Sequence, residues 1–259
     1  RSDYVEEPAP EQLIYGALKG MLATLDPYSQ FLDPDSYNEL KVDTEGEFGG
    51  LGIEITIKDD LLTIISPIDD TPAYKAGLLP GDRIVKIDGA ITRGITVLDA
   101  VKKLRGKPKT TVTLTILREG ESALKEVALE RAIIKIQSIR EAGILEDHIG
   151  YIRLSDFREH TTQDLEAALT KLKSQAMDSL ILDLRNNPGG LLDVAVSVSD
   201  LFLKRHQLIV STKGRLKNQN LEFHSRREGL VADIPLVVLL NEGSASASEI
   251  LAGAIQDHR

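Results

Sequence analysis

The alternation of apolar, strand-like runs with helix-like runs in residues 132–259 is the feature that most constrains how this chain can fold. Buried-looking strands are expected at 150–154, 179–184, 208–212 and 235–240. Helices are expected from Thr161 or Thr162, either of which can cap the helix, to about Ser174, then at 191–203 and around 251–255. This strand–helix rhythm predicts an α/β layer.

Residues 47–131 have a different pattern, in which short strands alternate with tight turns. Strands are expected at 53–57, 61–65, 83–87 and 111–117. Asp59-Asp60 separates the first two, which predicts a hairpin. Two short helices are expected, at 72–76 and at 96–104. The pattern predicts a β-rich domain with two helices.

Residues 1–46 are predicted to form a helical segment. Apolar residues recur there at helical spacing, and Asp26-Pro27 ends the run. The stripe consists of Ile14, Leu18, Met21, Leu22 and Leu25. Two interpretations remain open, a packing face within the chain and a dimer face, so a homo-oligomer through this helix is one expectation.

Composition excludes several classes of function. With 31 basic and 40 acidic residues the formal net charge is −9, which disfavours a general nucleic-acid binder. The chain has no Cys, so disulfides and Cys-based zinc sites are excluded. No apolar tract is long enough for a membrane span, and no signal peptide is visible. Because the chain starts at Arg1 without a Met, we expect a trimmed or mature form.

Glycines at 49, 50 and 52 lead into the strand at 53–57. Glycine lets consecutive backbone amides point the same way and form an anion-binding nest. A peptide carboxylate could sit on Gly50, Leu51, Gly52 and Ile53 while its chain pairs with the strand edge. A tight turn without a ligand is the alternative interpretation.

The run Asp183-Leu184-Arg185-Asn186-Asn187-Pro188-Gly189-Gly190 closes a strand and opens a helix. Backbone amides at such a turn can receive a developing oxyanion. An ordinary Asn-rich turn is the alternative interpretation.

A second strand-to-helix junction, 241–250, carries Ser244, Ser246 and Ser248. A hydroxyl at a helix N-terminus is a plausible nucleophile, since free amides and the helix dipole stabilise negative charge there. Helix capping is the alternative, because Ser246-Ala247-Ser248-Glu249 fits a capping box. Spacing alone does not choose among the three serines.

Taken together, these motifs resemble the carboxyl-terminal processing (tail-specific) peptidases, which are PDZ-containing Ser-Lys proteases. The resemblance implies a helical segment at 1–46, a PDZ domain at 47–131 and part of a crotonase-like α/β peptidase core at 132–259. It implies Ser246 as nucleophile, Gly190 and Ala247 as the oxyanion hole, and a groove between 53–57 and 96–104 that binds protein C-terminal tails. No metal or nucleotide cofactor is implied.

In that family a Lys about 25 residues after the nucleophile is the general base. This position would lie past Arg259, so we expect residues 1–259 to be C-terminally incomplete and inactive on their own. His258 cannot replace the base if the helix is continuous, because it lies roughly 18 Å along the helix from Ser246. The rival hypothesis is a non-catalytic PDZ scaffold on a degenerate core.

The resemblance also implies how and where the protein works. Arg105, at the end of helix 96–104, fits a residue that couples the PDZ domain to the protease, although a charge that complements the helix dipole is an equal alternative. An adaptor or activator protein is expected as a further partner. The implied location is the periplasm or cell envelope of a bacterium.

Overall fold

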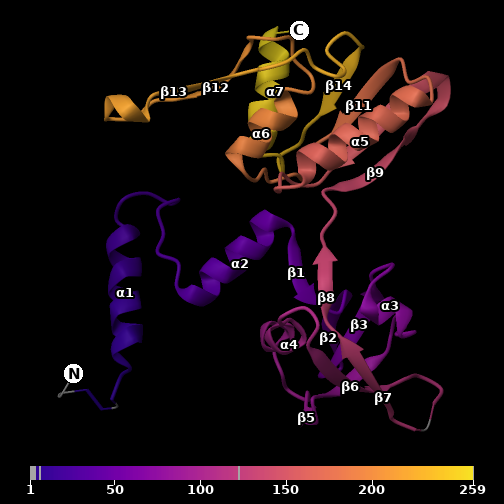
Figure 1. Cartoon of the computed structure of the whole chain (residues 1–259). Helices are drawn as coiled ribbons and strands as arrows, with labels where there is room; N and C mark the ends of the chain where they lie inside the picture. The colour runs from indigo at the N-terminus through magenta and orange to yellow at the C-terminus, as the bar shows by residue number, and fades with distance from the viewer. Residues whose placement is uncertain (1–3, 6, 122, 259) are drawn as a thin grey trace. The chain divides into compact units, whose positions relative to one another are not determined.

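The computed structural model describes residues 4–5, 7–121 and 123–258, which form two compact units, one up to Glu45 and one from Gly46 onward (Figure 1). The first unit contains two helices, α1 (Pro10–Leu22) and α2 (Pro34–Glu45). In it, the Lys19 ammonium pairs with the Asp33 carboxylate at 2.8 Å. The amide of Ser36 donates to that same carboxylate, which positions the start of α2.

No side chain of α1 is fully buried, although Leu18 and Leu22 are partly covered, so both interpretations of its apolar stripe, a packing face and a dimer face, stay open. Ile14 is 57% exposed and Met21 is 60% exposed. The second helix was not predicted. It has no buried residue either, and therefore no apolar periodicity that could have revealed it.

An antiparallel sheet dominates residues 53–130. Its strand order is β2-β3-β4-β6-β7, with β5 paired to β4. The bounds are β2 (Ile53–Lys58), β3 (Leu61–Pro67), β4 (Arg83–Ile87), β5 (Ala90–Ile91), β6 (Thr111–Leu117) and β7 (Lys125–Glu130). The predicted hairpin is confirmed, because Lys58 pairs with Leu61 across Asp59 and Asp60, which both have positive φ.

Two helices accompany this sheet, α3 (Pro72–Lys75) and α4 (Val97–Leu104). Thr71 and Thr96 cap them, each accepting an amide hydrogen bond with its side chain. Ala73, Ala100 and Leu104 are buried in the core of the sheet. The β-rich domain with two helices is therefore confirmed.

A separate pair of strands, β1 (Glu47–Gly50) and β8 (Ala132–Lys135), runs antiparallel. Gly49 and Gly50 are therefore strand residues, and the expected glycine loop is reduced to Leu51 and Gly52. Glycine is required at 49, since a Cβ there would lie 2.0 Å from the Gly106 carbonyl oxygen. The strand was missed because its partner is about 85 residues away in the sequence.

A four-stranded sheet of order β14-β11-β10-β9 carries the second core. The bounds are β9 (Ile139–Ile144), β10 (Ile149–Leu154), β11 (Ser179–Asp183) and β14 (Leu236–Leu239), with a short 3₁₀ turn η1 (Glu146–His148) between β9 and β10. Strands β10, β11 and β14 are parallel, and β9 is antiparallel to β10. Helices α5 (Thr161–Ser174), α6 (Leu192–Ser199) and α7 (Ala247–His258) contribute side chains to this core, so the predicted α/β layer is confirmed.

Two details of these helices correct the expectations. The N-cap of α5 is His160 rather than Thr161 or Thr162. The Thr161 hydroxyl instead accepts from the Arg158 amide and donates to Ser138. Helix α6 ends at Ser199 rather than 203, because the next residues form tighter turns that still bury Leu201 and Phe202.

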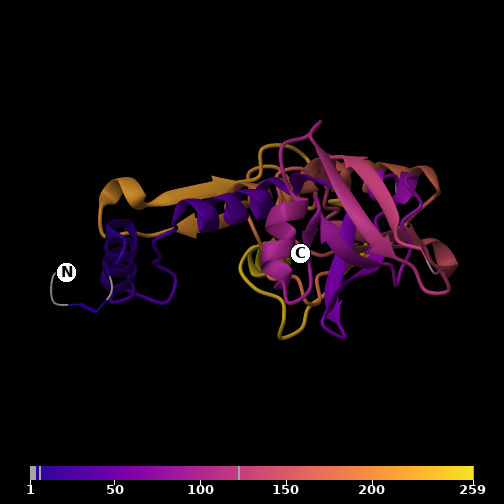
Figure 2. The same ribbon diagram turned by 90° about the horizontal axis from the view of Figure 1, so that it is seen from below.

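Strands β12 (Leu208–Thr212) and β13 (Leu221–His224) pair only with each other. This hairpin, closed by the 3₁₀ turn η2 (Lys217–Gln219), projects from the layer that holds α6 and α7 in both views (Figures 1 and 2). Within the described part of the chain, no helix is long and apolar enough to cross a bilayer.

Candidate active site

Three loops meet at the edge of the four-stranded sheet where its parallel strands end. They follow β10 at Leu154, β11 at Asp183 and β14 at Leu239. Because the carboxyl ends of parallel strands share one edge, this is where α/β proteins place their sites. A bridge between Phe157 and Gly190 joins the first loop to the second. The predicted glycine and serine motifs are therefore brought together.

Ser246 is the residue immediately before α7, and it is exposed to solvent. Its φ of +53° lies in the left-handed region, which costs about 1–2 kcal/mol for a residue with a Cβ. Strain of this kind concentrates at functional sites. The Glu249 carboxylate accepts a hydrogen bond from the Ser246 amide at 2.7 Å, which supplies the glutamate half of the predicted capping box.

The three candidate serines differ in what their hydroxyls do. The Ser244 hydroxyl donates to the Leu184 carbonyl at 2.8 Å. The Ser248 side chain is fully buried, and its hydroxyl donates to the Asn187 carbonyl at 3.0 Å. Among the described residues, the Ser246 hydroxyl has no hydrogen-bond partner. Only Ser246 combines exposure with an unengaged hydroxyl, a choice that spacing could not make.

The turn at 189–190 packs directly against the start of α7. A Cβ on Gly189 would lie 2.8 Å from both the Ala247 amide nitrogen and the Ser246 Cβ. Gly190 has a φ of +151°, and a Cβ there would lie 2.1 Å from the Phe157 carbonyl oxygen. In the part of the chain that the structure describes, neither the Gly190 amide nor the Ala247 amide donates a hydrogen bond. Two unengaged donors thus flank the Ser246 loop.

Asn187 holds this arrangement together, and sequence reasoning missed it. Its fully buried side chain donates to the Leu154 carbonyl at 2.9 Å and accepts from the Gly189 amide at 2.9 Å. Its carbonyl also accepts from the Ala245 amide. Asn187 therefore joins the end of β10, the glycine turn and the serine loop. In the sequence, the only sign of such a role is the presence of two adjacent Asn residues in the motif at 183–190.

A pair of asparagines, Asn186 and Asn241, joins the glycine turn and the serine loop nearer the surface. The Asn241 side chain donates to the Asn186 side-chain oxygen at 2.9 Å and accepts from the Asn186 amide at 2.8 Å. Asn186 adopts a φ of +59°, which asparagine tolerates better than most residues. The loops after β11 and β14 are thus held by reciprocal hydrogen bonds.

Asp183 ends β11 and is fully buried. The Arg185 guanidinium donates to it at 2.6 Å and the Tyr151 hydroxyl at 2.8 Å. The Arg185 hydrogen bonds hold the pKa of the Asp183 carboxyl well below its usual range, and Arg185 has its own pKa raised in return. Burial and the bond to Asp183 raise the pKa of Tyr151. This network fixes the strand end from which the glycine turn departs.

A second candidate site is a small groove of about 70 Å³ beside β2 and α4. Its lining includes Gly50, Leu51, Gly52 and Ile53, the four residues expected to bind a tail, together with Phe48, Ile55, Val101, Leu104 and Arg105. Gly52 has a φ of +76°. The amides of Leu51 and Gly52 donate no hydrogen bond within the described residues, so they are available to an anion.

Arg105 lies at the rim of this groove, with its guanidinium carbon 4.2 Å from the centre of the Phe48 ring. The carbonyls at the end of α4 accept from a different residue. Arg131 donates to the Leu104 carbonyl at 2.9 Å and to the Lys103 carbonyl at 2.8 Å. Arg131 thus donates the side-chain hydrogen bonds at this helix end, while Arg105, the C-cap residue, lies against Phe48.

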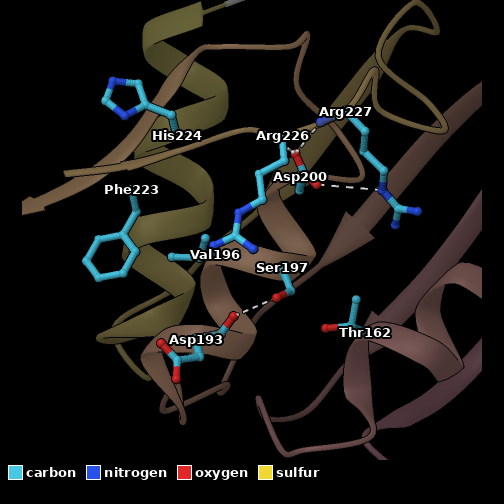
Figure 3. Close-up of a pocket in the computed structure, with 9 residues that line it drawn as sticks. All are labelled: Thr162, Asp193, Val196, Ser197, Asp200, Phe223, His224, Arg226 and Arg227. Carbon is cyan, nitrogen blue, oxygen red and sulfur yellow. Dashed lines mark hydrogen bonds and ion pairs between the residues drawn. The ribbon is translucent and has the colours of Figure 1, made fainter.

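A larger cavity of about 560 Å³ lies on the outer face of α6 (Figure 3). It is lined by Thr162, Asp193, Val196, Ser197, Asp200, Phe223, His224, Arg226 and Arg227. No sequence motif had pointed to it. Among residues 4–5, 7–121 and 123–258, no group of three or more His, Asp or Glu side chains is placed to hold a metal ion.

Comparison with known proteins gives matches to both the β-rich domain and the α/β layer of the second unit. Residues 148–259 match the model of peptidase family S41, and residues 49–129 match a PDZ domain. The chain is 46% identical to a carboxy-terminal-processing protease of Bartonella bacilliformis, covering all of this chain and 60% of that protein. It is 41% identical to a carboxyl-terminal-processing protease of Synechocystis, covering all of this chain and 62% of that one.

A solved structure, a photosystem II D1 C-terminal processing protease, is similar over nearly the whole chain. The two are 31% identical with a TM-score of 0.50, and the match covers 98% of this chain and 70% of that one. The chain spans about three fifths of the length of the two curated relatives named above.

Proposed function

We propose a proteolytic function for this chain, which belongs to the PDZ-containing carboxyl-terminal processing branch of peptidase family S41. In this proposal it is a serine endopeptidase that recognises the C-terminal tail of another protein and cleaves that protein. The observation that carries the proposal is the environment of Ser246. Among the described residues, its exposed hydroxyl makes no hydrogen bond, and neither do the two nearby amides of Gly190 and Ala247. The hydroxyls of Ser244 and Ser248, in contrast, donate to backbone carbonyls.

The chemistry is acyl transfer. The Ser246 hydroxyl oxygen attacks the scissile carbonyl carbon, and the amides of Gly190 and Ala247 donate to the oxyanion that forms. The peptide nitrogen leaves with a proton, which produces an acyl-enzyme on Ser246. Water then attacks this ester and releases the acid, restoring the serine.

A serine hydroxyl needs a base to take its proton. The proposal assigns this role to a Lys in a Ser-Lys pair, because a desolvated Lys can have a pKa low enough to act as a base. The resemblance places that Lys about 25 residues after Ser246, so none of the Lys residues in the 259 residues is assigned to it. His258 is excluded as a substitute, since its ring nitrogen Nε2 bonds to the Leu208 carbonyl at the far end of α7.

Tail recognition is assigned to the groove beside β2. A peptide that adds as a strand to β2 places its terminal carboxylate at the Leu51 and Gly52 amides and its last side chains against Ile55, Val101 and Leu104. The three-part division at 1–46, 47–131 and 132–259 is retained as a proposal. So are an adaptor or activator partner, oligomerisation through α1, and a location in the bacterial periplasm or cell envelope.

The test uses single alanine variants in the full-length protein. Ser246→Ala is expected to abolish cleavage of a tail-bearing protein while leaving the thermal transition nearly unchanged, because the capping bond to Glu249 uses the backbone amide of Ser246 and not its hydroxyl. Ser244→Ala and Ser248→Ala are matched controls that lower stability but retain turnover. A Ser246→Ala variant that cleaves at the wild-type rate would refute Ser246 as the nucleophile. A wild-type protein that cleaves no tail-bearing protein would favour a non-catalytic scaffold.

A further inference from the structure

The β12–β13 hairpin and its base carry a charge opposite to that of the rest of the chain. Residues 204–227 contain seven Lys or Arg residues and a single acid, Glu222. The remaining residues contain 24 Lys and Arg against 39 Asp and Glu. An acidic protein thus carries a locally positive net charge on one projecting element (Figures 1 and 2). Such an asymmetry indicates attraction to an anionic surface.

At the base of the hairpin, Arg226 and Arg227 form hydrogen bonds and ion pairs with acidic residues of the helical layer. The Asp200 carboxylate accepts from the Arg226 amide at 2.7 Å and pairs with the Arg227 guanidinium at 3.6 Å (Figure 3). Arg227 also pairs with Glu166 at 3.2 Å. The His258 ring bonds to the Leu208 carbonyl at the start of β12. The base is therefore anchored on α5, α6 and α7.

The tip is built differently, because its own polar side chains satisfy its backbone. The Gln219 side-chain oxygen accepts from the Leu216 amide at 3.2 Å, and the Asn220 side-chain oxygen accepts from the Gly214 amide at 2.9 Å. The Thr212 hydroxyl donates to the Gln219 carbonyl at 2.9 Å. These bonds satisfy backbone groups of the loop from within the tip itself.

What the tip presents outward is cationic and apolar. Lys213 and Arg215 are exposed, and within the described part of the chain neither forms an ion pair. Leu216, between Arg215 and Lys217 in the sequence, is 55% exposed. Two-stranded hairpins bury little surface of their own, and Leu221 on β13 is half exposed as well.

We propose that this hairpin docks on an anionic lipid bilayer, with residues 213–216 as the contact. Binding at a bilayer surface combines apolar insertion with attraction of Lys and Arg to anionic headgroups, and the tip offers both. Nucleic acid fits less well, since residues 213–216 have no aromatic side chain on which bases could stack. Repulsion of the acidic remainder would orient the protein with the hairpin toward the membrane. The proposal does not depend on proteolytic activity.

The test measures the partition of the full-length protein onto sucrose-loaded vesicles by sedimentation, in 50 mM salt. Vesicles of 30% phosphatidylglycerol in phosphatidylcholine are expected to bind it, whereas pure phosphatidylcholine vesicles and 500 mM salt suppress binding. The double variant Lys213→Gln with Arg215→Gln is expected to lower the partition coefficient about thirty-fold. Leu216→Ser is expected to lower it at least about ten-fold.

The matched control is Lys58→Gln with Arg140→Gln, which removes the same charges from exposed positions outside the hairpin. It is expected to partition within about two-fold of the wild type, since the tip is intact. Thermal melting checks that every variant is folded. The proposal is overturned if the wild type does not bind anionic vesicles, if neutral vesicles bind it equally, or if the control loses as much binding as the tip variants.

Discussion

Replacing Asn187 by Ala tests whether the glycine turn is held in place by a single buried side chain. The change removes the donor to the Leu154 carbonyl and the acceptor for the Gly189 amide, and both partners belong to the buried junction. Each buried group left without a partner costs about 1–3 kcal/mol. With two such groups, we expect the free energy of unfolding to fall by about 2–6 kcal/mol.

The same change should weaken catalysis, because the Gly190 amide is positioned by the turn that Asn187 holds. Loss of one oxyanion donor costs about 10²–10³ in kcat. We expect a fall in kcat of at least about 10² in the full-length enzyme. We expect little change in KM, because the groove proposed to bind the tail is lined by other residues, between Phe48 and Arg105.

Urea unfolding and steady-state cleavage of a tail-bearing protein measure the two effects. Asn218→Ala is the matched control, because Asn218 is exposed and its side chain makes no hydrogen bond among the described residues. The reasoning is refuted if Asn187→Ala unfolds and turns over like the control. It is also refuted if stability falls while kcat at a temperature well below unfolding stays at the wild-type value.

Two further predictions concern the groups around these sites. Asp183→Asn should cost about 1–3 kcal/mol at pH 7, because the buried side chain loses charge-assisted hydrogen bonds while Arg185 stays half exposed. Hydrogen bonds from Arg185 lower the folded-state pKa of Asp183, so its stabilisation is present above the unfolded pKa of about 4 and is lost progressively as pH falls toward the folded-state pKa. The difference from the wild type should therefore shrink from pH 5 to pH 3 in urea titrations, and a constant difference would contradict this. Arg105→Ala should reduce activation of the full-length enzyme by a tail-bearing substrate far more than it lowers the melting temperature, because Arg105 lies over Phe48 while Arg131 serves the helix end; wild-type activation would leave Arg105 without a coupling role.

Local patterns in the sequence predicted most elements of the fold. The hairpin across Asp59-Asp60 and helix α4 depend on neighbouring residues, so periodicity and turn chemistry predicted them. Strand β1 depends on pairing with residues 132–135, which no local pattern reveals. Just past the end of helix α6, the Leu201 carbonyl accepts from the Val231 amide, a contact with a distant segment that no local pattern reveals.

In the candidate site, too, local sequence predicted only the features that do not depend on contacts with distant residues. The family motif indicated Ser246, Gly190 and Ala247, but spacing could not separate Ser246 from its two neighbours. The structure separates them through the partners of Ser244 and Ser248, which lie about 60 residues away in the sequence. Asn187 was missed for the same reason, since its role consists of hydrogen bonds to residues on other loops.

The most direct measurement of the central claim is a crystal structure of the full-length protein treated with a peptide aldehyde. We expect a covalent bond between the Ser246 Oγ and the aldehyde carbon, with the resulting oxygen about 2.7–3.1 Å from the amide nitrogens of Gly190 and Ala247. An adduct on Ser244 or Ser248, or an oxygen that contacts neither amide, would contradict the assignment of this site.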